Sequence, residues 1–511
     1  MPAANATSES VAAGGWTGAD RLVFLVLVAA AMLRSLAIIL SPLELGVDEA
    51  QYWLWSTGFD FGYYTKPPLT SWIIGASHQL FGHHVWAVRL PAPWLHLVTA
   101  LVLWRAAAWF AGPVAGPIAG RLAALLWTSL PAVALGSFVI STDTPLLLFW
   151  SLGLLALVGG VTGRVPVRRA MMFAGGAFGI AFLGKYAAIY GLAGVLLFWG
   201  LDRLSGARVF SPASVLIFVF SMGVVASPNL LWNLANDFTT VRHLGDNANL
   251  DRQSLDPLNS LRFLGAQFAT AGPVVFALMF TILWPGRAGT GRDRAGGLLM
   301  RRLLICLSVP VIAVIMIQAF LSEANANWAL AAMPALVIWL ASWLAADGQG
   351  RWRARLGGVA LVINAGLSVI ILVVTLAGTL GPLTPQSDPL RRQRGWHQLA
   401  TDTQAALTRH EATTVIADRR ASAALLSWHF HGAGLTVLVH DEDGRPSNHF
   451  EQNLAWSHQP GRRLIRISDS IQPPRMDRVV WNLARQPGVS ATPISRNRTR
   501  RLYLHQGVEA D

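Results

Sequence analysis

Long apolar runs separated by short polar stretches fill the chain up to residue 380. A membrane-spanning helix needs about 20 predominantly apolar residues, and about eleven runs approach that length. In chain order they are Arg21–Leu40, Val85–Ala111, Arg121–Leu135, Thr144–Val161, Ala170–Leu183, Tyr186–Gly200, Val215–Trp232, Phe263–Trp284, Leu303–Phe320, Trp328–Ala345 and Gly357–Leu380. The pattern predicts an α-helical polytopic membrane domain over residues 21–380.

The pattern changes on either side of this region. Residues 1–20 are rich in Ala, Gly and Ser, and we expect a disordered cytoplasmic N-terminus there. Residues 381–394 contain three prolines and read as a linker. Residues 395–511 are polar and carry short β-type runs, namely Thr413–Ala417, Leu435–His440, Leu464–Ile467 and Arg501–His505. Helical patterns at Arg419–His429 and Arg475–Gln486 alternate with these runs, which predicts a small α/β domain.

Composition and charge support a membrane protein and give its orientation. The chain is 53% hydrophobic and only 13% charged, and its mean hydropathy is +0.44. Arginines cluster in alternate loops at 162–169, 202–208, 285–302 and 347–355, and the positive-inside rule places these loops in the cytoplasm. The other loops and the tail then lie outside. Because the arginines form no contiguous basic face, the net charge of +13 predicts no nucleic-acid partner. The single cysteine, Cys306, excludes an intrachain disulfide.

The first outer loop begins with two adjacent acids. The segment Gly46-Val-Asp-Glu-Ala-Gln-Tyr-Trp places Asp48 and Glu49 directly after the first apolar run. Charges so close to hydrocarbon are costly and usually functional. A carboxylate at this position can act as a general base or hold a divalent cation, so both acids are candidate catalytic residues. The alternative is that Asp48 only caps a helix.

A short interfacial helix is predicted for the same loop. Helical spacing groups four side chains on one face, namely Asp48, Gln51, Tyr52 and Trp55. Trp53 and Trp55 are expected at the level of the lipid headgroups. Tyr52 is a candidate for substrate contact, and Pro67-Pro68 ends any helix just after Lys66.

Lysine is almost absent from this chain. Of 40 basic residues only Lys66 and Lys185 are lysines, and a compact ammonium suits a phosphate group. The alternative is coding bias with two survivors. Tyrosines flank both lysines, and Arg89 adds a third cation on the outer side, although snorkelling to the headgroups would also explain it. The candidate phosphate-binding residues are Lys66, Arg89, Lys185, Tyr63 and Tyr64.

The remaining candidates lie at the outer ends of later spans. Asp143 in Ser-Thr-Asp-Thr-Pro is either a second functional acid or part of a helix cap. Amides beside tryptophan suit sugar hydroxyls and ring faces, and they also suit caps and interfacial anchors. The candidate substrate contacts are Tyr52, Tyr186, Asn233, Asn327 and Trp328. His78, His83 and His84 lack the carboxylate and the spacing of a zinc site, and no metal site is assigned.

Several of these motifs resemble the GT-C type of polyprenyl-phosphate-dependent glycosyltransferases. The resemblance is to the bacterial branch with protein mannosyltransferase-like proteins (family 39), lipid A aminoarabinose transferases and lipid-linked galacturonosyltransferases. The motifs that carry it are Gly46-Val-Asp-Glu-Ala-Gln-Tyr-Trp, Gly62-Tyr-Tyr-Thr-Lys-Pro-Pro-Leu, Phe81-Gly-His-His-Val-Trp-Ala-Val-Arg-Leu-Pro, Thr142-Asp-Thr-Pro-Leu, Leu183-Gly-Lys-Tyr, Pro228–Asn233, Asn327-Trp328 and Arg394-Gly-Trp. Gln51 stands where the aminoarabinose transferases more often carry arginine.

The resemblance implies a GT-C fold with about 11–13 transmembrane helices. It implies Asp48 as the catalytic carboxylate, Lys66 on the donor phosphate and Asp143 as a further functional acid. The donor would be a polyprenyl-phosphate sugar, and the acceptor a hydroxyl of a lipid such as lipid A or of a protein. Transfer would occur at the periplasmic face of a bacterial inner membrane. A divalent cation is the only cofactor that these acids suggest.

Two other functions fit part of the pattern. A transporter or flippase of lipid-linked sugars would also have many spans and intramembrane charges, but an internal repeat is expected there and none is visible. A membrane scaffold with an outer binding module leaves the clustering of lysine and tyrosine unexplained.

Overall fold

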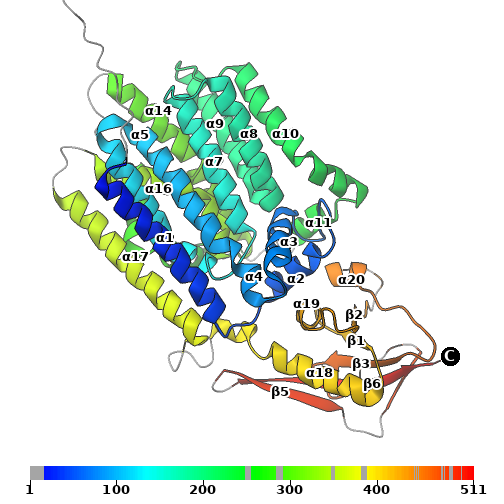
Figure 1. The fold of residues 1–511 in the computed structure, drawn as a ribbon. Coiled ribbons are helices and arrows are strands. Elements are labelled where there is room, and N and C mark those ends of the chain that lie inside the picture. Colours follow the sequence, from blue (N-terminus) through cyan, green and yellow to red (C-terminus); the bar gives the residue numbers. More distant parts are fainter. Residues whose placement is uncertain are drawn as a thin grey trace, which may run out of the picture.

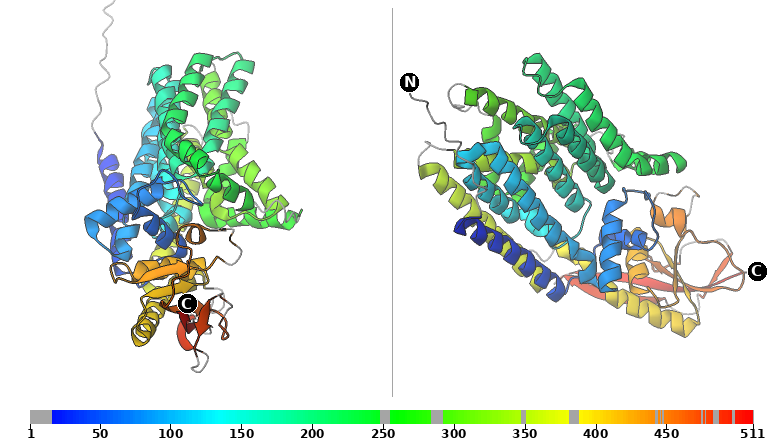
Figure 2. Two further views of the ribbon diagram at one scale, coloured as in Figure 1. Left: turned by 90° about the vertical axis from the view of Figure 1, so that its right-hand side faces the viewer. Right: turned by 45° about the horizontal axis from the view of Figure 1, so that its top comes forward.

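The computed structural model consists of a helical bundle with a smaller α/β layer at one end (Figure 1). It describes residues 16–510, apart from 248–254, 284–291, 347–350, 381–387, 442–443, 445, 447, 474–475, 477, 483–486 and 496–497. Most of the expected N-terminal segment and half of the expected linker therefore lie outside the described residues. Figure 2 shows from two further sides that the α/β layer sits below one end of the bundle.

The bundle is built from long apolar helices. Their bounds are α1 (Gly18–Leu40), α5 (Pro91–Ser129), α7 (Asp143–Val161), α8 (Val167–Gly184), α9 (Ile189–Leu204), α10 (Pro212–Ala235), α12 (Pro257–Ala271), α13 (Pro273–Met279), α14 (Arg292–Cys306), α15 (Val309–Leu321), α16 (Met333–Ala345) and α17 (Arg351–Ala377). Within the described residues, eight helical segments are long and apolar enough to cross a membrane, or nine with the bent pair α12–α13. In its described part, each apolar run expected from the sequence is mostly helical, which confirms a polytopic helical membrane domain.

Two features explain why the count of spanning helices is lower than the count of apolar runs. The chain turns back inside α5 at Gly112, whose φ of 77° is accessible to glycine at low cost, and Pro113 starts the second arm. Gly120 then packs against Trp104 of the first arm. In addition, α8 carries Arg168 and Arg169 in its first turn, yet it packs along α7 and α10 as a member of the bundle.

The helix α7 lies in the interior of the bundle. In the most apolar stretch of α7, 72% of the residues are buried, whereas in that of α17 only 17% are. Asp143 is the first residue of α7. The helix α1 begins at Gly18, slightly earlier than expected, because Thr17 and Asp20 form a capping box there.

Short helices lie between the bundle and the α/β layer (Figure 1). They are α2 (Val47–Ser56), α3 (Leu69–Phe81), α4 (Val85–Arg89) and α11 (Thr239–Asn247). The short helix α6 (Pro131–Gly136) packs on α5 and α17, and the 3-10 turns η1 (Tyr186–Ala188), η3 (Phe280–Leu283) and η4 (Ala326–Ala332) belong to the bundle. The predicted helix in the first outer loop is α2. Trp53 and Trp55, expected at the level of the lipid headgroups, are buried within the protein and only 1% and 2% exposed. Trp53 packs on Trp428 of the α/β layer, and Trp55 stacks on Tyr63.

The α/β layer is a mixed sheet with helices packed on it. Its strands run in the order β2-β1-β3-β6-β4, and β5 pairs with β6. The bounds are β1 (Thr414–Ala417), β2 (Thr436–Val439), β3 (Arg463–Ser468), β4 (Val479–Trp481), β5 (Gly488–Ser495) and β6 (Arg498–Glu509), with η6 (Pro389–Gln393), α18 (Trp396–His410), α19 (Arg420–His429) and α20 (His449–Asn453). β1 is parallel to β2 and β3, and β6 is antiparallel to β3.

The four expected strands and the helix over Arg419–His429 are confirmed. The helix expected over Arg475–Gln486 is wrong in its described part, where Val479–Trp481 forms β4 and pairs with the end of β6. Two adjacent valines and a tryptophan favour a strand. Residues 474–475, 477 and 483–486 of that segment lie outside the described part of the chain.

Candidate active site

A buried ion pair fixes the start of the first outer loop. Glu49 lies in the first turn of α2, and its Oε2 accepts the Gly46 N–H at 2.8 Å. Arg89 of α4 donates from Nε to Glu49 Oε1 at 2.9 Å and from Nη2 to Oε2 at 2.8 Å. The Ile140 N–H also donates to Oε1, at 3.2 Å. The side chains of Glu49 and Arg89 are 1% and 2% exposed, so both groups are saturated by the protein.

This geometry decides between two earlier alternatives. Gly46 occupies the N-cap position of α2 and Glu49 supplies the capping carboxylate, so Asp48 is not the cap. Arg89 is buried among protein acceptors, so it does not snorkel to the headgroups.

Asp48 points away from the Glu49–Arg89 ion pair and toward the α/β layer. Its Oδ1 accepts from Nη2 of Arg420, the first residue of α19, and Arg420 Nε donates to Gln51 Oε1. The side chain of Asp48 is 66% exposed and that of Arg420 is 41% exposed. Two acids adjacent in the sequence therefore have opposite environments, because consecutive residues of a helix do not share a face.

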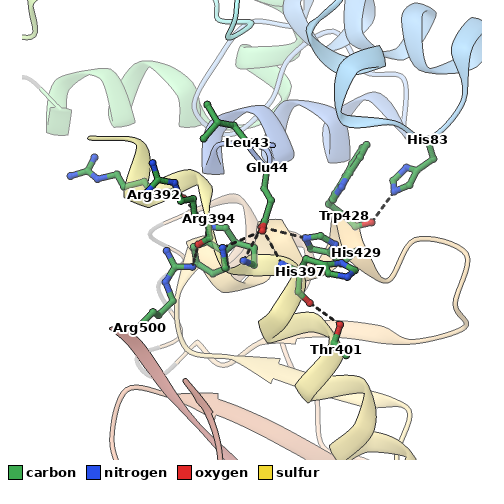
Figure 3. Close-up of polar contacts among 12 residues, drawn as sticks. Leu43, Glu44, His83, Arg392, Arg394, His397, Thr401, Trp428, His429 and Arg500 are labelled. Carbon is green, nitrogen blue, oxygen red and sulfur yellow. Dashed lines mark hydrogen bonds and ion pairs between the residues drawn. The ribbon is translucent and has the colours of Figure 1, made fainter. Parts of the chain in front are cut away.

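Glu44 joins the membrane part to the α/β layer (Figure 3). Its carboxylate accepts three consecutive backbone N–H groups at 2.8 to 3.1 Å, those of Gly395, Trp396 and His397. These are the free donors at the start of α18. Arg89 in turn donates to the carbonyls of Leu43 and Glu44 at 3.1 and 2.7 Å, so one guanidinium fixes both the loop and this junction.

Asp143 lies at the centre of a second, more open polar group. Lys185 Nζ donates to Asp143 Oδ1 at 2.6 Å, and Asn327 Nδ2 donates to Oδ2 at 2.8 Å. The side chains of Lys185 and Asp143 are 17% and 9% exposed. Thr142 is the N-cap residue of α7 and makes no side-chain cap bond. The Ser141 hydroxyl accepts the Asp143 N–H at 3.3 Å, whereas the Asp143 carboxylate binds Lys185 and Asn327, so the side chain of Asp143 is not the cap.

A cavity of about 260 Å³ lies beside the Asp143–Lys185 pair. Both lysines of the chain line it, Lys66 from the loop before α3 and Lys185 from the junction of α8 and η1. Its other walls are mostly aromatic and aliphatic, namely Thr65, Pro67, Tyr186, Ala187, Ile189, Tyr190, Val314, Ile315, Gln318 and Trp328. Ammonium groups at apolar walls suit a ligand with an anionic head and a hydrocarbon tail.

Lys66 is the more available of the two lysines. Within the part of the chain that the structure describes, its ammonium has no hydrogen-bond acceptor or ion-pair partner, whereas Lys185 binds Asp143. Burial lowers the pKa of Lys66 below its ordinary value, and the like charge of Lys185 adds to this effect. Asp48 and Asp143 act in the opposite direction, so these charges form one electrostatic cluster.

The tyrosines near Lys66 hold the loop in place. The Tyr63 hydroxyl lies 2.9 Å from the carbonyls of Trp55 and Gly58, and burial raises its pKa to about 12. The Tyr64 hydroxyl donates to the carbonyl of Pro446 in the α/β layer at 2.7 Å. Tyr52 is 5% exposed, and burial together with the nearby Asp48 raises its pKa.

Amide side chains connect the cavity wall to the same loop. The Tyr186 hydroxyl donates to Asn229 Oδ1 at 2.9 Å and accepts from Asn233 Nδ2 at 3.0 Å. Asn229 Nδ2 donates to the carbonyl of Phe61 at 2.7 Å. Asn229 was part of a sequence motif but not a candidate, and its role in tying α10 to the first outer loop is visible only in the fold.

The fold thus separates the candidates into two groups. It gathers Lys66, Lys185, Asp143, Tyr186, Asn327 and Trp328 at or beside the cavity. It places Glu49 and Arg89 in the buried ion pair at the start of the first outer loop. Asp48 and Asp143 each face a side-chain cation, so these two described acids do not form a paired carboxylate site for a divalent cation. Arg420 was missed, because nothing in the tail sequence indicates which loop it will contact.

Comparisons with known proteins agree with this architecture. Residues 65–232 match the family described as dolichyl-phosphate-mannose-protein mannosyltransferase. The chain is 34% identical over 425 residues to the lipid A galacturonosyltransferase RgtD of Rhizobium johnstonii, which covers 83% of this chain and 85% of that protein.

Solved structures share the fold at lower identity. The chain superimposes on ArnT from Cupriavidus metallidurans in the apo state with a TM-score of 0.61, over 96% of this chain and 98% of that one, at 15% identity. The TM-score is 0.62 for the same protein bound to undecaprenyl phosphate, with 94% and 97% coverage and 15% identity.

Proposed function

Because the chain belongs to the GT-C glycosyltransferases of the protein mannosyltransferase-like family, we propose that it moves a sugar from a polyprenyl-phosphate carrier to a hydroxyl of a lipid A-type acceptor. It is a multi-pass membrane enzyme, and the transporter alternative is excluded by its family. We place the reaction at the periplasmic face of a bacterial inner membrane, on the side that the arginine-poor loops occupy.

The observation that carries this proposal is the meeting of Lys66 and Lys185 in one partly apolar cavity. The chain has no other lysine, and these two lie in different outer loops. The apolar walls suit the first isoprene units of the carrier, and the two ammonium groups suit its phosphate. A related structure bound to undecaprenyl phosphate has the same fold, which supports the choice of carrier.

The charges fit the bond that must break. In the donor, the sugar carbon C1 is bonded to an oxygen of a phosphodiester with one negative charge. Transfer breaks this C1–O bond, forms a bond from C1 to the acceptor oxygen, and releases a polyprenyl phosphate monoester of higher charge. Lys66 would stabilise this growing charge, assisted by Lys185, in a site with little water.

Asp48 is the proposed general base. It would accept the proton of the acceptor hydroxyl as that oxygen attacks C1, and its exposed carboxylate can be reached from the outer surface. The negative charge of Asp48 acts to raise the pKa of Lys66, which supports a base and a phosphate site within one charged cluster. A single displacement of this kind inverts the configuration at C1.

The other candidates receive supporting roles in this proposal. Asp143 and Asn327 would hold Lys185 at the cavity, and Tyr186, Asn233 and Trp328 would line the path of the sugar. Glu49 and Arg89 would position the loop rather than touch the donor, since both are saturated. Tyr63 and Tyr64 would hold the loop that presents Lys66, and Tyr52 would shape the surroundings of Asp48.

We propose further that the sugar is a uronic acid, as the name of the relative RgtD suggests. Arg420 supports this choice, because a guanidinium fork binds a carboxylate through two parallel hydrogen bonds. Its partners here are side chains of the first outer loop, Asp48 and Gln51. A uronate carboxylate could take the place of Asp48 on Arg420 and so release Asp48 for proton transfer.

The test is an assay with purified protein, a polyprenyl-phosphate uronic acid and lipid A, in which release of polyprenyl phosphate and mass gain of lipid A are measured. Asp48→Asn keeps the shape of the side chain and removes the base. We expect turnover to fall by about 100-fold or more, the scale of a lost general base, with unchanged melting temperature. Normal turnover in Asp48→Asn would refute the assignment of the base, and no transfer by the wild type to any lipid would refute the acceptor class.

The proposed orientation has its own test. Gly58 lies in the first outer loop, and Gly297 lies in the N-terminal half of α14, next to an arginine-rich loop. A Cβ added at either position would meet no other atom within 4 Å. In a Cys306→Ser background, Gly58→Cys should react with a membrane-impermeant maleimide applied to spheroplasts. Gly297→Cys should react only after lysis. Labelling of Gly297→Cys from outside would contradict the proposed orientation.

A further inference from the structure

Three histidines converge where the first outer loop meets the α/β layer. His78 lies in the last turn of α3, His83 in the loop before α4, and His431 directly after α19. One ring nitrogen of each lies within 4.8 Å of those of the other two. Among the described His, Cys, Asp and Glu side chains, this is the group that converges in this way. Spacing within the loop alone argued against a metal site, because the third ligand comes from the tail.

The hydrogen bonds orient one of these rings for metal binding. His83 Nε2 lies 3.0 Å from the carbonyl of Trp428, and a dashed line marks this contact in Figure 3. A carbonyl can only accept, so this nitrogen carries the proton and Nδ1 keeps its lone pair. Histidine ligands of metals are commonly fixed in this manner through their second nitrogen. His83 Nδ1 accepts a hydrogen bond from His78 Nε2 at 3.2 Å, so a metal ion would take the place of this proton and His78 would then carry its proton on Nδ1.

The separation of these two nitrogens matches a tetrahedral zinc site. With Zn–N bonds of about 2.0–2.1 Å, two ligand atoms of a tetrahedron lie about 3.3–3.4 Å apart. We propose that His78, His83 and His431 bind one zinc ion, with water in the fourth position. The third nitrogen, that of His431, is within reach after a small side-chain movement, because this residue is exposed.

The surroundings favour neutral imidazoles. The Trp53 ring lies 5.9, 5.1 and 5.2 Å from the rings of His78, His83 and His431, and Trp428 stacks on His83 at 3.7 Å. Burial lowers the pKa of His83 to about 4 and also lowers that of His78, so both rings are neutral near pH 7. Neutral imidazole is the form that binds metals.

Such an ion would link two parts of the molecule. His78 and His83 belong to the loop region of the membrane part, and His431 follows the helix whose first residue, Arg420, contacts Asp48. Zinc would therefore hold the C-terminal end of α19 against the loop, while its N-terminal end contacts the proposed catalytic residue. The role is structural docking, which is separate from the chemistry of transfer.

The test measures metal rather than activity. Full-length protein, purified without a polyhistidine tag, is stripped with a chelator, incubated with excess zinc and desalted, and its zinc content is measured by mass spectrometry. We expect about one zinc per chain and a higher melting temperature in the zinc-loaded form. Wild-type protein that retains no zinc after desalting would overturn the proposal.

Three variants identify the ligands. His431→Gln should lose the bound zinc, and since the residue is exposed the protein should still fold. His431→Cys should retain zinc, because a thiolate is also a zinc ligand. His84→Ala is the matched control, since this neighbouring ring stacks on Trp86 instead and should not affect zinc content. Equal zinc content in His431→Gln and wild type, or zinc loss in His84→Ala, would overturn the assignment.

Discussion

Two carboxylate–cation pairs at the same end of the molecule have similar contacts and different surroundings. In the Glu49–Arg89 pair, both side chains are at most 2% exposed, and backbone groups occupy the remaining positions of the acid. In the Asp143–Lys185 pair, the lysine is 17% exposed and lines a cavity that a second lysine shares.

The difference lies in what remains unsatisfied. A buried pair with every oxygen engaged cannot bind a substrate without losing those bonds, so its charge serves the fold. A pair beside a cavity can share its lysine with an anionic ligand. Charge near a membrane therefore indicates function only when part of its hydrogen-bonding capacity is left for a ligand.

The largest expected effect comes from breaking the saturated pair. Arg89→Met should leave Glu49 charged, buried and without its partner, which costs about 3–5 kcal/mol of stability. The yield of monodisperse protein and its melting temperature should fall sharply. Lys185→Met, the matched change in the open pair, should lower the melting temperature much less. Equal losses in the two variants would erase the distinction between the pairs.

The second effect concerns the cavity. Lys66→Ala should weaken binding of undecaprenyl phosphate by about 10- to 100-fold, the range of one charged hydrogen bond, while the protein stays folded. Lys66→Arg should restore little, because a planar fork does not replace a point charge beside two prolines. Thr65 lines the same cavity and carries no charge, so Thr65→Ala serves as the control. Wild-type affinity in Lys66→Ala would remove this lysine from the phosphate site.

A smaller, substrate-dependent effect is expected at Arg420. Arg420→Gln should raise KM for a uronyl donor by about 10-fold and leave KM for a neutral hexosyl donor unchanged, since only the uronate offers a carboxylate for the fork. Initial rates with the two donors measure this. The same rise for both donors would assign Arg420 to positioning Asp48 instead of to sugar recognition.

A fourth effect is a dependence of stability on pH. His449 packs on Trp55 at the contact of the α/β layer with the loop, and burial lowers its pKa from 6.5 to about 4. Between these values the unfolded chain binds a proton that the folded protein does not, so stability falls as the pH drops through this window. The melting temperature of wild type should fall more from pH 7 to pH 4.5 than that of His449→Gln. Identical slopes would assign the titration to other groups.

The sequence alone was sufficient to identify those site residues whose type is rare in the chain. Lys66 and Lys185 were candidates because the chain has no other lysine, and the fold brings both to one cavity. Apolar runs likewise predicted the spans, since each needs only its own length to be recognised. The turn at Gly112 inside α5 is consistent with the two runs that flank it.

What the sequence did not reveal depends on contacts between distant segments. The adjacency of Asp48 and Glu49 indicated a shared role, but their side chains diverge and Glu49 is completed by Arg89 and Ile140. Arg420 and His431 come from the tail, and only docking of α19 brings them to the loop. The strand at Val479–Trp481 depends on β6, which follows it in the chain.

The Glu44 carboxylate that caps α18 also implies an order of assembly. The first helix of the tail finds the acceptor for its free N–H groups in a residue that precedes it by most of the length of the protein. During synthesis that acceptor is already in place before the tail emerges. The membrane part thus supplies the cap that the first helix of the tail needs. In a tail produced alone, the start of α18 would fray.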